Sequence, residues 1–154
     1  MVRPITLKIR AKKLGVLLRD ARLSTGKSMK ECAEILGISS AKIGTFERGD
    51  KSPSLPELEI LAFFLDIPLE HFWSQASRFT NQEERFGSTN LARLIPLRQR
   101  ILGARLRKAR TEDQITQKAL AQSVGITPAR LKSYETGEQP IPLPELEGIA
   151  AELD

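Results

Sequence analysis

The sequence predicts an all-α protein in which one small helical unit occurs twice, with a polar linker between the two copies. The first observation is an internal repeat: residues 14–66 align without a gap on residues 102–154, and 21 of the 53 aligned residues are identical. A repeat distance of 88 residues is too long for one unit of a solenoid and indicates a duplicated domain. The second observation is helical spacing of apolar residues in both copies, without hairpin dipeptides between alternating apolar runs.

The first two helices of the first copy have clear sequence signals. Leu14, Leu18 and Ala21 are spaced to lie on one face of a first helix. Ser28 and Glu31 form a capping box, in which each side chain accepts a hydrogen bond from the backbone of the other residue. This pair predicts the start of a second helix.

Three more helices follow in the first copy. Gly37 ends the second helix, because glycine tolerates left-handed backbone, and Ser39 caps a third helix that Gly49 ends. A second capping box at residues 54–57 begins a fourth helix, and Pro68 begins a short fifth one.

We therefore expect two tandem domains of four to five helices. The first spans residues 1–73 and includes a basic N-terminal arm, and residues 74–95 form the linker. The second spans residues 96–154, where Thr116 and Thr127 replace the serine caps.

The second copy has no counterpart of the fifth helix in this sequence. Without that lid, Leu146, Ile149 and Leu153 would form an apolar patch on a very small domain. We expect either lower stability of this copy or burial of the patch by a homodimer, another partner protein or the linker.

Composition excludes several classes of function. One cysteine rules out a disulfide framework within the chain, and one cysteine with one histidine leaves almost no material for a zinc site or a Cys–His nucleophile. Phosphate-binding loops, paired catalytic carboxylates and membrane-spanning runs are also absent. We therefore expect a cytoplasmic protein that is not an enzyme, with no catalytic residues, no cofactor, no metal and no membrane segment.

The distribution of charge favours a polyanionic partner. The net charge is +5. Residues 1–30 hold nine bases and one acid, and residues 96–110 hold six bases and no acid. Residues 53–70 and 145–154 hold only acids. Each copy therefore has a positive and a negative end, which suits docking on nucleic acid.

The three-residue turn at residues 37–39 joins the second and third helices so closely that they must cross steeply. This is a helix-turn-helix arrangement, in which the second of the two helices can enter a DNA major groove. The segments SMKECAEILGISSAKIGTFERG and TQKALAQSVGITPARLKSYETG resemble the helix-turn-helix of the Cro and lambda-repressor (XRE) family. The resemblance covers about 60 residues of the first copy and 53 of the second.

The resemblance implies lambda-repressor-like domains, sequence-specific binding of double-stranded DNA and a regulator of transcription that is repressor-like. It implies partly buried salt bridges between Arg22 and Glu47 and between Arg110 and Glu135. The residues that it places at DNA are Ser28, Met29, Ser39, Ser40, Ala41, Lys42, Thr45, Arg48, Thr116, Gln117, Thr127, Pro128, Ala129, Arg130, Lys132, Ser133 and Thr136.

The two copies differ at one position where the family usually has a glutamine that contacts phosphate. The second copy has Gln117 there and the first has Met29, so we expect the second copy to be the stronger DNA reader. Few side chains suited to base recognition occupy the third helices, so we expect phosphate contacts to dominate. Both copies would dock on one duplex about one helical turn, roughly 34 Å, apart, and direct repetition would allow direct or unequal half-sites.

Two other functions use the same fold and stay open at this point. One is a protein-interaction scaffold, which Met29, Gly44 and the sparse base-reading groups favour and the basic first helices oppose. The other is an antitoxin-like regulator that binds both DNA and a partner protein.

Overall fold

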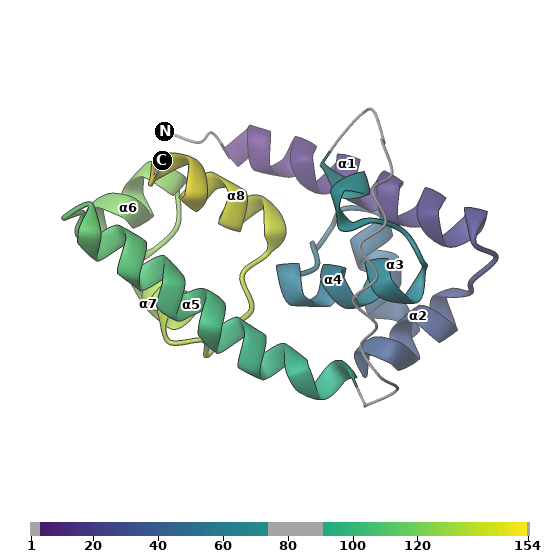
Figure 1. Ribbon diagram of the computed structural model, residues 1–154. Helices are drawn as coiled ribbons and strands as arrows, with labels where there is room; N and C mark the ends of the chain where they lie inside the picture. The colour runs from purple at the N-terminus through teal and green to yellow at the C-terminus, as the bar shows by residue number, and fades with distance from the viewer. Residues whose placement is uncertain (1–3, 74–90, 154) are drawn as a thin grey trace.

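A computed structural model describes residues 4–73 and 91–153, and every regular element in these two ranges is helical. Figure 1 shows the first copy and the second copy side by side. The elements of the first are α1 (Pro4–Ser24), α2 (Met29–Leu36), α3 (Ser40–Glu47), α4 (Leu55–Phe64) and the 3₁₀ turn η1 (Leu69–Phe72); those of the second are η2 (Leu91–Arg93), α5 (Leu94–Glu112), α6 (Gln117–Val124), α7 (Pro128–Glu135) and α8 (Leu143–Glu152).

Local capping explains where the short helices begin and end. Ser28 and Glu31 form the expected capping box, with the Glu31 backbone N–H donating to Ser28 Oγ at 3.1 Å. Gly37 ends α2 at φ +67°, in the left-handed region that glycine adopts at little cost. Ser39 and Thr127 cap α3 and α7 through their side-chain oxygens.

Both first helices are longer than the repeat alone indicates. Residues 4–13, expected as an arm, form the first half of α1. Residues 91–95, expected as the end of the linker, form η2 and the start of α5, and η2 packs on α2. The rest of the expected linker, residues 74–90, lies outside the described residues. None of the described helices has the length and apolar character needed to cross a membrane.

Each copy has its own apolar core, and the two cores meet at α8. Leu14, Leu18 and Phe46 belong to the core of the first copy, together with Leu143 of the second copy. Leu146 packs against both cores.

The described part of the chain itself covers some of the apolar patch that the sequence predicts on α8. Ile149 is fully buried and Leu153 is half-buried within the second copy's own core, whereas the half-buried Leu146 packs against both cores. Helix α1 of the first copy packs against α8.

The two copies are related by an approximate two-fold rotation. In the repeat, α1 corresponds to α5 and α4 corresponds to α8. Helix α1 packs on α8 and α4 packs on α5, so each copy gives the other the same contact that it receives. Figure 1 shows α1 and α5 running in opposite directions along the two sides of the molecule.

Two further contacts locate the axis. Ser54 and Pro142, which occupy the same position in the repeat, pair with each other in an antiparallel bridge. A residue can meet its own counterpart in this way only next to a two-fold axis. Beside this bridge, the Leu143 backbone N–H donates to the Pro53 carbonyl oxygen at 3.0 Å.

A symmetric pair of ion pairs links the copies on either side of the axis. Arg10 Nη2 lies 2.8 Å from Glu147 Oε1, and Arg98 Nε lies 2.6 Å from Glu59 Oε2. Arg10 and Arg98 are counterparts in the repeat, as are Glu59 and Glu147. The two copies therefore face each other by rotation.

Candidate nucleic-acid interface

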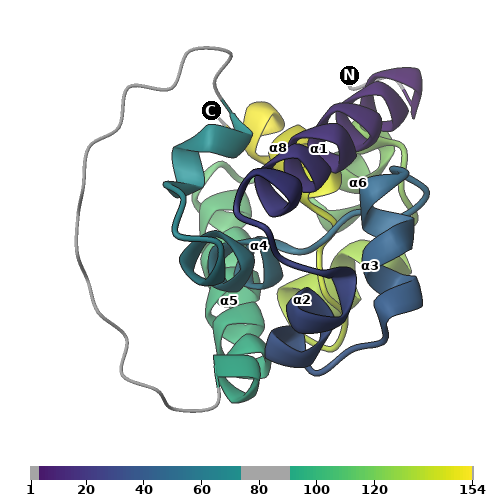
Figure 2. The same ribbon diagram turned by 90° about the vertical axis from the view of Figure 1, so that its right-hand side faces the viewer.

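The third helix of each copy, α3 or α7, presents a polar face to solvent. In Figure 1 these helices lie behind α4 and α5, and Figure 2, turned by 90°, shows α3 on the side of the molecule away from α5. The rotation therefore places both helices on one face, which we call the reading face. The expected DNA-contacting residues on it are exposed (Ser28, Met29, Ser39, Ser40, Ala41, Arg48, Thr116, Thr127, Pro128, Ala129, Arg130, Lys132, Thr136) or half-buried (Lys42, Thr45, Gln117, Ser133).

A buried ion pair beneath each third helix joins it to the first helix of the same copy. Arg22 Nε lies 2.5 Å from Glu47 Oε1, and Arg110 Nε lies 2.5 Å from Glu135 Oε1. Both pairs are bidentate, because each Nη2 also donates to the second carboxylate oxygen at 3.0 Å. Hydrogen bonding to the carboxylates raises the pKa of both guanidinium groups above the ordinary arginine value. These pairs hold α3 and α7 at a defined angle.

Gln117 extends the ion pair of the second copy. Its Nε2 donates to Glu135 Oε2 at 2.7 Å. Burial alone would raise the pKa of Glu135, but the hydrogen bonds from Arg110 and Gln117 outweigh burial and leave this pKa below the ordinary value. At the equivalent position of the first copy, Met29 is 40% exposed and has no amide to donate. The structure thus places Gln117 against Glu135, at the edge of the reading face.

Two of the expected phosphate-binding cations are held by carboxylates of the fourth helices. Lys42 Nζ lies 3.4 Å from Glu57 Oε1, and Arg130 Nη2 lies 2.8 Å from Glu145 Oε1. These are the same pair of positions in the two copies. Arg130 also donates to the Tyr134 hydroxyl, which raises the pKa of the guanidinium. Burial and the hydrogen bond to Glu145 raise the pKa of Tyr134, so this phenol is protonated at neutral pH.

The remaining expected cations are more accessible. Arg48 is 62% exposed and pairs with Asp50 at 2.9 Å, and Lys12 contacts the same carboxylate. Within residues 4–73 and 91–153, no carboxylate lies within ion-pair distance of the exposed Lys132.

Lys132 lines a shallow pocket of about 500 Å³ between α5, α6 and α7. Its other lining residues include Arg107, Thr116, Gln117 and Thr136. Apart from the already paired Glu135, these groups are cationic or can donate hydrogen bonds. The pocket can therefore accept an anion such as a phosphate group.

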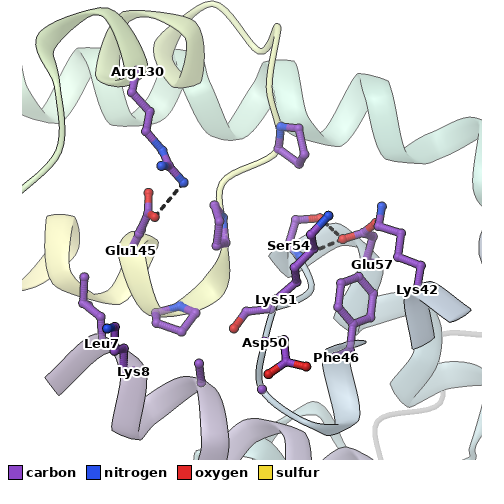
Figure 3. Close-up of a pocket in the computed structure, with 16 residues that line it drawn as sticks. Leu7, Lys8, Lys42, Phe46, Asp50, Lys51, Ser54, Glu57, Arg130 and Glu145 are labelled. Carbon is purple, nitrogen blue, oxygen red and sulfur yellow. Dashed lines mark hydrogen bonds and ion pairs between the residues drawn. The ribbon is translucent and has the colours of Figure 1, made fainter. Parts of the chain in front are cut away.

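A second pocket of about 430 Å³ opens between the copies (Figure 3). Lys42 and Arg130, one from each third helix, lie on opposite sides of it, each turned toward its own glutamate. Lys8 and Lys51 also line it, and no ion pair holds either of them among the described residues. Ser54 and Pro142, the bridged pair beside the two-fold axis, also line this pocket. The carboxylates of Asp50, Glu57 and Glu145 also line this pocket, so the four cationic side chains exceed the acidic ones by a single charge.

Reasoning from the sequence missed the contacts that join the copies. In the sequence, Arg10 and Arg98 are recognised only as members of the basic segments 1–30 and 96–110. One signal was present, since the repeat distance of 88 residues also relates Arg10 to Arg98, outside the aligned range. Arg107 was likewise missed as a lining residue of the pocket in the second copy.

Comparison with known proteins agrees with this geometry. A helix-turn-helix domain family matches residues 13–71 and again residues 101–153, together more than half of the chain. The chain is also 31% identical over 83 residues to the transcriptional regulator ClgR of Mycobacterium tuberculosis, in strains CDC 1551 and H37Rv. The alignment covers 54% of this chain and 70% of each relative. No solved structure gives a significant match. This chain therefore belongs to the helix-turn-helix domain family and carries the domain twice.

Proposed function

We propose that this protein is a repressor-like transcriptional regulator that binds double-stranded DNA in a sequence-specific way and applies both helix-turn-helix copies to one duplex. The observation that carries the proposal is the position of α3 and α7 on one face, with their capped N-terminal ends exposed. Helices of this kind enter the major groove with their N-terminal residues against the base edges. The similarity to a protein named as a transcriptional regulator supports the same function.

Phosphate contacts supply most of the affinity in this proposal. Lys132 and Arg107 flank the shallow pocket of the second copy, where Gln117 and two threonine hydroxyls can also face a phosphate oxygen. One cation of the third helix must first leave a carboxylate in both copies: Lys42 leaves Glu57 in the first, and Arg130 leaves Glu145 in the second. The copies differ at their other cation, because Arg48 pairs with Asp50 whereas Lys132 has no ion pair among the described residues. This difference, together with Gln117 in the pocket, supports the second copy as the stronger DNA reader.

A salt titration tests the proposal. Fluorescence anisotropy would follow binding of the full chain to a random duplex pool and to duplexes selected from it, at several salt concentrations. We expect the logarithm of affinity to fall linearly with the logarithm of salt concentration, by about 0.9 for each phosphate neutralised. Selected duplexes should bind at least 100-fold more tightly than the random pool. Equal affinity for both would contradict sequence-specific regulation.

Variants of the two third helices test their ranking. Alanine at Gln117, Arg130 and Lys132 together should weaken binding more than alanine at Lys42, Thr45 and Arg48. Lys108→Ala is a matched single-charge control for Lys132→Ala, because Lys108 lies on α5, is 75% exposed and, among the described residues, pairs with Glu112 alone, at 3.8 Å. Lys132→Ala should reduce the salt slope by about 1, and Lys108→Ala should leave it unchanged. Thermal melting of each variant separates lost binding from lost folding.

The second candidate function is that of a protein-interaction scaffold, which the surface of the first copy favours. Met29 presents an apolar side chain where the second copy has Gln117, and the cations Lys42 and Arg48 are both neutralised by neighbouring carboxylates. Absence of any salt-sensitive duplex binding by the folded chain would favour this scaffold function.

A further inference from the structure

The geometry points to a single chain that reads an imperfect inverted repeat in DNA, without dimerising. This inference rests on the proposed DNA binding and adds the symmetry of the target, the number of chains that it takes and the relation between its half-sites. Sequence duplication alone allowed direct or unequal half-sites. The packing of the copies leads to a different target.

The symmetry follows from the contacts across the axis. A head-to-tail translation would bring α1 against α8 without also bringing α5 against α4. Both contacts are present, and Ser54 meets its counterpart Pro142. Two readers related by a two-fold axis present their recognition helices in opposite senses along a duplex, so their half-sites must be inverted. Helices α3 and α7 share one face in this arrangement.

The chain uses the corresponding surfaces internally, which argues for one chain per site. Arg10 pairs with Glu147 and donates a further hydrogen bond to the Phe72 carbonyl oxygen at 2.8 Å. Arg98 pairs with Glu59, and Leu143 is fully buried in the core of the other copy. A second chain cannot form these contacts without first opening them. One chain therefore already has the two-fold pair of readers that a homodimer would otherwise supply.

Two lysines that have no ion pair among the described residues lie at the pocket between the copies. The pocket between the copies opens between α3 and α7, and Lys8 and Lys51 line it. When recognition helices occupy two major grooves one turn apart, the minor groove of the segment between them faces the protein. These lysines then lie opposite phosphates of the central segment.

The two half-sites should be related without being identical. Ala41 and Ala129 are counterparts, and both are exposed near the start of their helices. Each can contact a thymine methyl group, so the facing position should be shared. Ser40 and Pro128 are also counterparts but differ chemically. The bases facing these positions should therefore differ between the half-sites.

Selection from a random duplex pool with the full chain tests the inference directly. We expect an imperfect inverted repeat whose half-site centres are about 10 base pairs apart. Sedimentation of the purified complex should give one chain per duplex. The inverted pair should bind at least 100-fold more tightly than a single half-site, because joining two modules raises affinity by about 10²–10⁴.

The outcomes of this selection distinguish failure of the inverted-repeat inference from failure of the proposed DNA binding. A selected direct repeat, a single half-site or two chains per duplex would overturn the inference and leave the proposed DNA binding intact. Failure to select any duplex, by a chain that is folded, would instead overturn the proposed function and this inference with it.

Variants at the ion pairs test whether the axis sets the spacing. Inserting about five base pairs between the half-sites moves them to opposite sides of the duplex, and this should cost the parent chain most of its bivalent gain. Charge reversal at Glu59 and Glu147 together should reduce the penalty for that insertion. Further reversal at Arg10 and Arg98 should restore the penalty by re-forming both pairs with opposite polarity. Glu112→Arg, at an exposed site on α5, is the control. A penalty unchanged by the first pair of reversals would contradict this role of the axis.

Discussion

Removing the carboxylate of Glu135 should destabilise the second copy more than any comparable change at the surface. Glu135→Ala removes two hydrogen bonds from Arg110, at 2.5 and 3.0 Å, and one from Gln117 at 2.7 Å. The Arg110 side chain is only 10% exposed in the parent chain, and it would keep the hydrogen bond that it donates to the Ile115 carbonyl oxygen at 2.8 Å. An unpaired charge in such a site costs about 3–5 kcal/mol.

Urea unfolding followed by circular dichroism measures this cost. With a slope of about 2 kcal/mol/M, the unfolding midpoint should fall by roughly 1.5–2.5 M. Glu47→Ala in the first copy removes two hydrogen bonds from a pair with 11% and 7% exposure, so its cost should lie at the lower end of the range. If Glu135→Ala does not fold, Glu135→Gln tests the same charge at nearly constant volume.

Two further variants test whether burial of the charge causes the loss of stability in Glu135→Ala. Glu112→Ala removes an exposed carboxylate from its pair with Lys108 and should cost about 0.5 kcal/mol or less. Replacing Arg110 by Met together with Glu135 by Leu should cost much less than Glu135→Ala, because no unpaired charge is left behind. Equal costs for Glu135→Ala and Glu112→Ala would show that burial of the Arg110–Glu135 pair does not determine the cost.

Three further predictions concern pH, close packing and capping. The pKa of Glu135 is lowered in the folded state, so the ionised carboxylate stabilises the fold at pH values above the ordinary pKa of 4.5. This stabilisation is lost as the pH falls through the lowered pKa. Urea unfolding should therefore show the parent chain and Glu135→Gln converging in stability below that pH. Gly15→Ala would bring Cβ to 2.5 Å from the Glu47 carbonyl oxygen, and thermal melting should show a loss of about 1–3 kcal/mol in the free energy of unfolding. At Gly44→Ala the nearest atom to Cβ is the flexible end of Arg48 at 3.1 Å, so this variant should lose less stability. Ser28→Ala should cost about 1 kcal/mol in the same assay through the lost cap of α2, and no loss would contradict the role of the capping box.

Local signals in the sequence were sufficient for the short helices but not for the N-terminal ends of α1 and α5. The capping box at Ser28 and the left-handed Gly37 depend on interactions within one or two turns, so residue order alone predicts them. The buried pair of Arg22 and Glu47 was reached only through the family resemblance, because 25 residues separate its members. Nothing local indicates that two such residues will meet.

The arrangement of the copies could not be predicted from the repeat. A duplicated sequence is equally compatible with translation and with rotation, and the choice depends on which exposed surfaces complement each other. Arg10 and Glu147 belong to oppositely charged segments that each read as solvated. Only the distance of 2.8 Å between Arg10 Nη2 and Glu147 Oε1 in the folded chain identifies them as partners. The same reasoning explains why the shielding of Lys42 by Glu57 was not anticipated.

An internal two-fold axis passes beside residues 54 and 142. Bridge partners in an antiparallel pair have Cα atoms about 4.5–5.5 Å apart, which suits a disulfide. The decisive measurement is therefore mass spectrometry under non-reducing conditions on a chain with Cys at both positions and with Cys32 replaced by Ala. We predict a disulfide within one chain, seen as the loss of two hydrogens from the monomer, with duplex binding retained. Two free thiols in the folded monomer, or a disulfide only between chains, would contradict the claim.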